Sequence, residues 1–102
     1  MSAKPVRFYR AALDETDAAA AWYGERSRAA QIKFLEELDW AIARIARDPR
    51  AFAPFTAGTR RILLPHFPYQ VIFRETAGAI EQIAVAHTRR NPGHWRSTSG
   101  RP

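Results

Sequence analysis

The C-terminal third of the sequence holds the residues whose types and spacing could carry out chemistry. Two histidines, two adjacent arginines and a tryptophan occur within one short segment, as His87, Arg89, Arg90, His94 and Trp95. Histidine exchanges a proton near neutral pH, and arginine can clamp an anion, so the set could form an acid/base site with cationic clamps. Interpreted instead as a cationic surface beside an indole, the same set is typical of a site that binds another macromolecule.

The positive charge of the protein is concentrated in the half of the sequence that contains this segment. The chain has 102 residues and a net charge of +6. Residues 1–48 hold eight Lys or Arg and eight Asp or Glu, whereas residues 49–102 hold eight arginines and only Glu75 and Glu81 as acids. Such asymmetry favours a polyanionic partner, which is either nucleic acid or an acidic protein.

Composition disfavours several other classes of function. The chain has no cysteine, which rules out thiol catalysis, disulfides and iron–sulfur clusters. Its three histidines lack the spacing of a metal motif, and no phosphate-binding loop, dinucleotide fingerprint or nucleophile elbow is present. We therefore predict no metal, no cofactor and no small-molecule substrate. There is no apolar run of membrane-spanning length and no secretory signal, so we predict a cytoplasmic protein without membrane contact.

Three consecutive strands must position the basic segment. β-Branched and aromatic residues predict strands over 62–64, 69–73 and 80–87. Pro65 and Pro68 deny the ladder two amide donors and predict a turn between the first two strands. Gly78 permits a short hairpin between the last two. The basic segment begins where the last strand stops.

Side-chain alternation assigns the residues of these strands to two faces of the sheet. In the last strand, Ile83 and Val85 are predicted to lie opposite Ile80 and Ala84, while Ile72 of the preceding strand faces away from its apolar neighbours. If the helices cover one face only, the other face is partly apolar and open. An open apolar face flanked by arginines would be a binding surface.

The N-terminal half is predicted to be scaffold. Residues 6–9 alternate like a short strand, and an alanine-rich helix is expected to end near Gly24. Ser27 is a plausible N-cap for a second helix, and Pro49 ends that helix at Asp48. The second helix carries apolar residues at spacings of 3, 3, 4 and 3, which predict one stripe facing the core. These are Ile32, Leu35, Leu38, Ile42 and Ile45.

These elements predict an α+β fold with the order β-α-α-β-β-β. A helical hairpin packs on one face of a small antiparallel sheet. The connector between the second helix and the sheet carries Phe52 and Phe55, which we expect to cover the core. Residues 1–96 are predicted to form a single domain, and residues 97–102 a disordered tail without apolar content.

The strand region resembles a known family. The segment RRILLPHFPYQVIFR, followed by AVAHTRRNPGHW, has an arginine-rich strand entry, a Phe-Pro-Tyr turn, an aliphatic strand ending in Arg and a final His-x-Arg-Arg-x-Pro-x-x-Trp pattern. In these features, and in element order over residues 4–96, the chain is similar to the ParE/RelE superfamily of toxins from bacterial type II toxin–antitoxin modules. The resemblance implies the RelE/ParE-like fold and a cognate, ParD-like antitoxin that lies along the helices and sheet in a hetero-oligomer.

The resemblance implies two functions of different classes. ParE-like members perform no chemistry and poison DNA gyrase by protein contact, whereas RelE-like members are ribosome-dependent endoribonucleases that cleave mRNA. Such cleavage requires a base, a cationic stabiliser and an acid. Gln70 occupies the position after the turn tyrosine where RelE-like enzymes tend to carry arginine, and no C-terminal tyrosine matches theirs. We therefore favour the gyrase inhibitor, which is not an enzyme. A member that retains only partner binding is a third possibility.

The two functions assign roles to different residues. A nuclease would use His87, Arg89, Arg90, Arg61 and His94, whereas the gyrase inhibitor needs no catalytic residue. For target binding we expect the basic segment to act, namely Arg89, Arg90, His94, Trp95 and Arg96. For antitoxin binding we expect Arg60, Arg61, Ile72, Arg74 and Trp22. One of Arg60 and Arg61, which open the first strand of the meander on opposite faces, is expected to pair with a helix acid.

Overall fold

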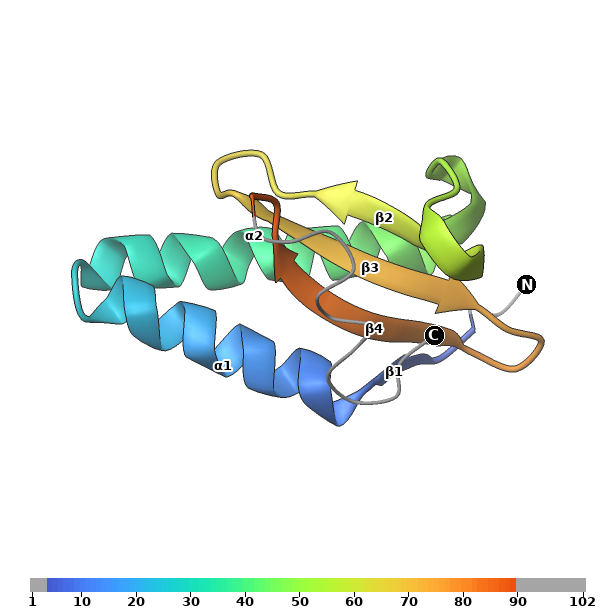
Figure 1. Cartoon of the computed structure of the whole chain (residues 1–102), viewed down its shortest axis with the longest axis horizontal. Coiled ribbons are helices and arrows are strands. Elements are labelled where there is room, and N and C mark those ends of the chain that lie inside the picture. The colour runs from blue at the N-terminus through green and yellow to red at the C-terminus, as the bar shows by residue number, and fades with distance from the viewer. Residues whose placement is uncertain (1–3, 90–102) are drawn as a thin grey trace.

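The computed structural model of the protein describes residues 4–89 and has two layers. Its elements are β1 (Val6–Phe8), α1 (Arg10–Gly24), α2 (Arg28–Arg47), the 3₁₀ turns η1 (Pro49–Ala51) and η2 (Thr56–Gly58), β2 (Arg60–Leu63), β3 (Tyr69–Glu75) and β4 (Ile80–His87). The antiparallel helices α1 and α2 form one layer and the twisted sheet forms the other (Figure 1). The α+β prediction and the predicted order of elements are therefore confirmed.

The four strands form one sheet in the order β1-β4-β3-β2. Strands β2, β3 and β4 form the predicted antiparallel meander. Strand β1 instead pairs in parallel with β4, with Val6 opposite Ile80, so the sheet is mixed rather than wholly antiparallel. A parallel pair cannot be joined by a tight turn, and here the whole segment from α1 to β3 connects the two strands.

Local sequence signals set the ends of the second helix as predicted. The Ser27 hydroxyl accepts a hydrogen bond from the Ala30 N–H at 3.2 Å, which satisfies one of the free donors at the start of α2. The helix ends at Arg47, two residues before Pro49. The Gln31 amide donates to the carbonyl of Ala20 at 2.9 Å and ties α2 to α1.

The buried stripe of α2 differs from the predicted one. Ile32 and Leu35 are 47% and 38% exposed, whereas the buried residues are Phe34, Leu38, Ala41 and Ile45. This stripe has spacings of 4, 3 and 4, so it also satisfies helical periodicity. The register with Phe34 inward buries an aromatic ring, and the prediction that Ile32 and Leu35 face the core was wrong.

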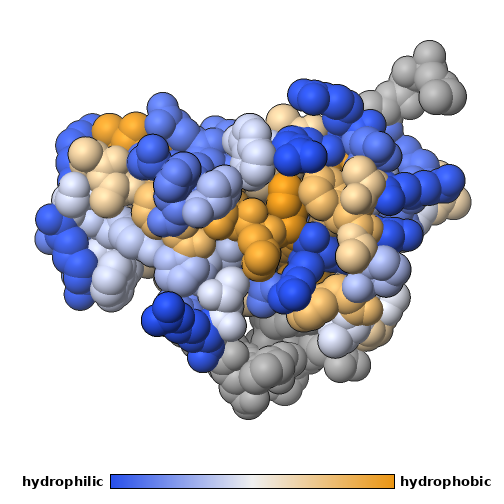
Figure 2. All heavy atoms as spheres, turned by 90° about the horizontal axis from the view of Figure 1, so that it is seen from above, coloured by the Kyte–Doolittle hydropathy of each residue, from blue (hydrophilic) through white to orange (hydrophobic). Residues whose placement is uncertain are grey.

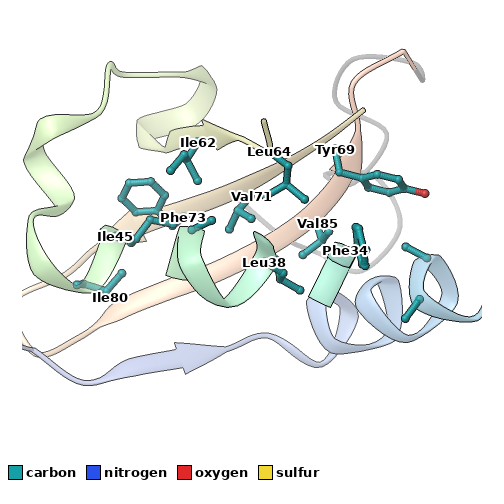
Figure 3. Close-up of a cluster of buried hydrophobic side chains, with 13 residues drawn as sticks. Phe34, Leu38, Ile45, Ile62, Leu64, Tyr69, Val71, Phe73, Ile80 and Val85 are labelled. Atoms are coloured by element: carbon teal, nitrogen blue, oxygen red, sulfur yellow. The ribbon is translucent and has the colours of Figure 1, made fainter. Parts of the chain in front are cut away.

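The main core lies between the helices and the sheet. The ring of Phe34 is within 5.5 Å, between centroids, of the rings of Tyr23, Phe67 and Tyr69. In Figure 3, Phe34 and Tyr69 lie at one end of the cluster. Phe52 packs against the same cluster, as predicted for the connector. Edge-to-face aromatic packing therefore joins both helices to the start of β3.

A β-bulge in β4 changes which side chains share a face. The register between β3 and β4 shifts after Ile72, so that Phe73 pairs with Gln82 and one residue of β4 is extra. As a result, Ile80 and Val85 lie in the main core, whereas Ile83 joins Ala84 in a second cluster with Ile72. The predicted grouping of Ile83 with Val85, and of Ile80 with Ala84, was wrong because simple alternation fails across a bulge.

The second face of the sheet is not an open apolar surface at these positions. Ile72, Ile83 and Ala84 are fully buried, and Tyr9 and Phe55 pack against them. The expectation of an open apolar face is therefore corrected. The second 3₁₀ turn, which follows Phe55, also includes the one described non-glycine residue with positive φ, Ala57 at 54°.

A carboxylate from α1 accepts a hydrogen bond from the backbone at the outer edge of β4. Strand β1 pairs with β4 only as far as Gln82. Farther along β4, the Val85 N–H donates to Oε1 of Glu15 at 2.9 Å, so that a side chain replaces a strand partner. A buried amide without an acceptor costs free energy comparable to a lost hydrogen bond, so Glu15 is a structural residue.

Replacing Glu15 with alanine is expected to lower the free energy of unfolding by about 1–3 kcal/mol, because the Val85 N–H would lose its acceptor. Urea denaturation followed by circular dichroism measures the change. Asp14→Ala is the matched control, since the Asp14 side chain is 61% exposed in a surface ion pair with Arg10. Equal stabilities for the two variants would contradict this role of Glu15.

A carboxylate at the β3–β4 hairpin joins three segments that are distant in the sequence. Glu75 accepts hydrogen bonds from Lys4 at 2.8 Å and from Arg50 at 3.1 Å. Together these bonds hold the pKa of the Glu75 carboxyl below its ordinary value of 4.5, and the bond from Lys4 has the larger effect. The ion pairs connect the segment before β1 and the turn after α2 to the hairpin.

The lowered pKa of Glu75 predicts acid sensitivity. The stabilisation is fully present above the ordinary value of 4.5 and is lost as the pH falls through the lower pKa of the folded protein. Thermal unfolding between pH 7 and pH 3 should therefore show a smaller acid-induced decrease in Tm for Glu75→Gln than for the unmodified protein. Parallel pH profiles for the two proteins would contradict the role of the carboxylate.

Candidate functional site

The described part of the basic segment lies at the end of β4. Nδ1 of His87 accepts a hydrogen bond from the Arg89 backbone N–H at 3.1 Å, and the Thr88 N–H donates to the carbonyl of Pro68 at 2.8 Å. These bonds fix the backbone where the strand stops, while the Arg89 side chain is exposed. The other predicted target-binding residues, Arg90, His94, Trp95 and Arg96, lie outside the described residues.

A row of aromatic rings leads from this strand end to α1. The His87 ring lies edge-on to Tyr69 at 5.2 Å between centroids, Tyr69 lies 6.3 Å from Tyr23, and Tyr23 lies 5.0 Å from Trp22. Burial, and then the neighbouring Tyr69, raise the pKa of Tyr23. The row extends the site from the end of β4 to the last turn of α1.

The row ends in an exposed indole stacked with a guanidinium. Trp22 is 50% exposed, and the guanidinium carbon of Arg26 lies 3.7 Å from its ring centroid. Nη1 of Arg26 also donates to the Trp22 carbonyl at 2.7 Å, which holds the stack in place. Sequence reasoning missed Arg26, which lies two residues beyond the end of α1 but keeps the four-residue spacing from Trp22 that brings side chains together on a helix.

Arg61, which was assigned to the nuclease set and to antitoxin binding, lies elsewhere. It pairs with Ile72 in the β2–β3 register, and its Nη1 donates to Gln70 Oε1 at 2.9 Å. Its guanidinium carbon lies 4.5 Å from the centroid of the Phe55 ring, on the face of the second cluster. His87 pairs with Tyr69 on the face of the main core. Arg61 and His87 are therefore on opposite faces of the sheet.

The remaining antitoxin-binding candidates are largely engaged within the protein. Nη1 of Arg60 donates to the Phe52 carbonyl. Nη2 of Arg74 donates to Glu81 at 2.7 Å, a bond that raises the pKa of Arg74. Ile72 is fully buried, which removes it from the surface. Trp22 and Arg61 are thus the exposed side chains among the five antitoxin-binding candidates.

The expected ion pair between Arg60 or Arg61 and a helix acid does not occur among residues 4–89. Both arginines are used by the connector or by β3. A nearby acid of α2, Glu37, instead binds the turn between β2 and β3. It accepts the His66 N–H at 3.0 Å and contacts Nδ1 of the same histidine. His66 therefore anchors that turn to α2.

Several large hydrophobic side chains remain exposed outside the aromatic row. They include Leu13 on α1 at 40%, Ile32 and Leu35 on α2, and Trp40 on α2 at 42%. On the side seen from above, where β2 forms the edge of the sheet, hydrophobic side chains gather near the middle between hydrophilic ones (Figure 2). Leu63 of β2 is 52% exposed. A protein of this size normally covers such side chains with a partner when they cluster.

Two further features of the described residues concern metal ions and membranes. Within the described range, no group of three potential metal-binding side chains comes together. No helix found there combines the length and the hydrophobicity that crossing a membrane requires. The described site consists of aromatic rings, one strand-end histidine and exposed guanidinium groups.

Comparison with known proteins identifies relatives of the whole described fold. A family model described as the ParE toxin of the type II toxin–antitoxin system parDE matches residues 6–92. The protein named Toxin ParE2 in two strains of Mycobacterium tuberculosis is 42% identical over 55 residues, which is 54% of this chain and 52% of the relative. The match thus spans about half the length of these curated relatives.

A solved structure shares the fold. One chain of the structure titled "Chromosomal ParDE TA system from P. aeruginosa" superposes with a TM-score of 0.75. The superposition covers 84% of this chain and 97% of that one, at 16% sequence identity. At this identity the likeness concerns the fold, and it agrees with the helical hairpin on a four-stranded sheet.

Proposed function

Because the chain belongs to the ParE family of toxins from type II toxin–antitoxin systems, we propose that it arrests growth by binding DNA gyrase and is neutralised by a ParD-like antitoxin. The family match over residues 6–92 carries this proposal. The exposed basic and aromatic end of the molecule supports it, because tryptophan and arginine are the residues most enriched at binding hot spots. Gyrase acts on DNA in the cytoplasm, so the toxin would act there.

The described geometry favours binding over mRNA cleavage. A nuclease site needs its acid, base and cationic clamp within reach of one phosphate. His87 and Arg61 lie on opposite faces of the sheet, and Gln70, which cannot supply a guanidinium, is held by Arg61 at 2.9 Å. These contacts support a toxin that acts through a protein contact.

The antitoxin is proposed to cover the exposed hydrophobic side chains of the helices. Leu13, Ile32 and Leu35 are each between 38% and 47% exposed on α1 and α2. Burial of such apolar surface contributes about 25 cal/mol of favourable free energy per Å², which would stabilise a bound segment of the antitoxin. The neutralised toxin would be a hetero-oligomer with the antitoxin laid along the helices.

Two assays performed side by side test the proposed function. Purified toxin is incubated with gyrase, ATP and supercoiled plasmid, and separately with translating ribosomes and mRNA. We expect linear, cleaved plasmid that depends on the toxin and disappears when antitoxin is added, with mRNA left intact. Toxin-dependent mRNA cuts without trapped plasmid cleavage would replace the proposal with ribosome-dependent endonuclease activity. Growth arrest without plasmid cleavage and without mRNA cleavage would contradict both activities, and only the family assignment would remain.

A further inference from the structure

We propose that Trp22 of α1 and Arg26 of the turn after α1 form a second anchor of the surface that contacts the target, and that the partner they fit is a protein surface bearing carboxylates. This inference rests on the proposed function, because it assumes that the toxin acts by protein contact. The sequence-based hypothesis placed Trp22 with the antitoxin instead. The structure places it at the other end of the aromatic row from His87 and Arg89.

Continuity of the row is the first argument. Centroid distances of 5.0, 6.3 and 5.2 Å connect Trp22 through Tyr23 and Tyr69 to His87. The middle of the row is packed, since Tyr69 is 9% exposed, whereas the Trp22 indole is 50% exposed. The helical hairpin extends past the sheet on the side where β4 ends (Figure 1). A partner that meets Arg89 at the end of β4 therefore finds the indole on the neighbouring helix.

Pre-organisation is the second argument. The Arg26 guanidinium stacks 3.7 Å from the indole centroid and donates to the Trp22 carbonyl at 2.7 Å, which restricts the rotamers of both side chains before any partner arrives. An ordered aromatic and arginine pair loses less entropy on binding than two free side chains. Trp and Arg are also the residue types that dominate interface hot spots.

Charge identifies the chemistry of the partner. Arg26, Arg28 and Arg89 are exposed. Glu25, the acidic residue next to Arg26 in the sequence, makes only a long contact of 4.0 Å between its Oε2 and Nη1 of Arg26. Two of the nitrogens of a stacked guanidinium remain available for a carboxylate, which it binds in a bidentate manner. An acidic protein surface with a hydrophobic depression for the indole fits these groups.

The chain contains a matched control pair, Trp40 and Arg44, on α2. Trp40 is 42% exposed, and the guanidinium carbon of Arg44 lies 5.3 Å from its ring centroid, also four residues later. This pair belongs to α2, where Arg44 also lies 5.5 Å from the Phe52 ring, and within residues 4–89 its ring contacts lead through Phe52 to Phe73 of β3 rather than to His87. A non-specific effect of removing any exposed indole would appear in both variants.

The experiment compares full-length Trp22→Ala, Arg26→Ala, Arg26→Glu and Trp40→Ala with the unmodified toxin. Growth arrest is measured by titrated expression in cells, plasmid cleavage with purified gyrase, and antitoxin affinity by calorimetry, with Tm as a check on folding.

We expect that about tenfold more of the Trp22→Ala or Arg26→Ala toxin is needed for arrest and for cleavage than of the unmodified toxin. Antitoxin affinity should be unchanged, Trp40→Ala should match the unmodified toxin, and Arg26→Glu should be weaker than Arg26→Ala.

Each other outcome is decisive. Undiminished arrest by Trp22→Ala and Arg26→Ala overturns the inference, as does a loss of antitoxin affinity in the same variants or an equal loss in Trp40→Ala. Equal activity of Arg26→Glu and Arg26→Ala overturns the inference that the partner surface is acidic. If the unmodified toxin arrests growth but leaves gyrase unaffected, the proposed function fails, while the growth-arrest comparison still decides whether Trp22 and Arg26 contact the target.

Discussion

A toxin that ends at Thr88 is expected to fold but to lose growth arrest and gyrase inhibition. Truncation removes residues 89–102, which include the basic segment from Arg89 onward and half of the arginines of residues 49–102. The hydrogen bonds from Thr88 to Pro68 remain, so the end of β4 keeps its anchor. Loss of two hot-spot residues, each worth about 2 kcal/mol, should raise the inhibitory concentration by about 1,000-fold.

Gyrase-dependent plasmid cleavage and titrated expression in cells measure this effect, with far-ultraviolet circular dichroism and antitoxin binding as tests of folding. Arg89→Ala in the full chain separates the contribution of one side chain from that of the segment. Arg47→Ala is its matched control, because Arg47 is an exposed arginine in the last turn of α2. Full toxicity of the truncated protein would refute the role of the basic segment in binding the target.

Replacing Phe34 with alanine is expected to lower the free energy of unfolding by about 3–5 kcal/mol, a large share of the total stability of such a domain. Phe34 is fully buried and lies between Tyr23 of α1, Phe67 of the turn and Tyr69 of β3. Its removal leaves a cavity at the point where both helices meet the sheet. Urea denaturation at neutral pH gives the change directly.

Leu35→Ala is the control for Phe34→Ala and also tests the helix register. Leu35 is 38% exposed on the same turn of α2, so its replacement should cost less than about 1 kcal/mol. The register predicted from the sequence, with Leu35 inward, would give the opposite order. A larger loss of stability in Leu35→Ala than in Phe34→Ala would therefore show that α2 packs with the other face toward the sheet.

Much of the fold was predictable because it depends on local physics. Proline and glycine restrict or free the backbone, and a serine hydroxyl can cap a helix only at its start, so Ser27 and Pro49 predicted the bounds of α2. Alternation of β-branched and aromatic residues predicted the meander, and with it the position of Arg89 just beyond the end of β4. Trp22 and Arg61 were selected as antitoxin contacts, but their positions in space could not be inferred from the pattern.

Tertiary structure decided the features that depend on contacts between two segments of the chain. Two apolar stripes of α2 satisfy the same helical period, and only the ring contacts of Phe34 with the sheet select one of them. The bulge at Ile83 depends on pairing with β3, and the parallel pairing of β1 depends on which edge of the sheet was free. The link from Trp22 to His87 passes through side chains of α1 and β3. Periodicity along one chain describes each element separately, whereas the free energy that chooses among registers comes from contacts between elements.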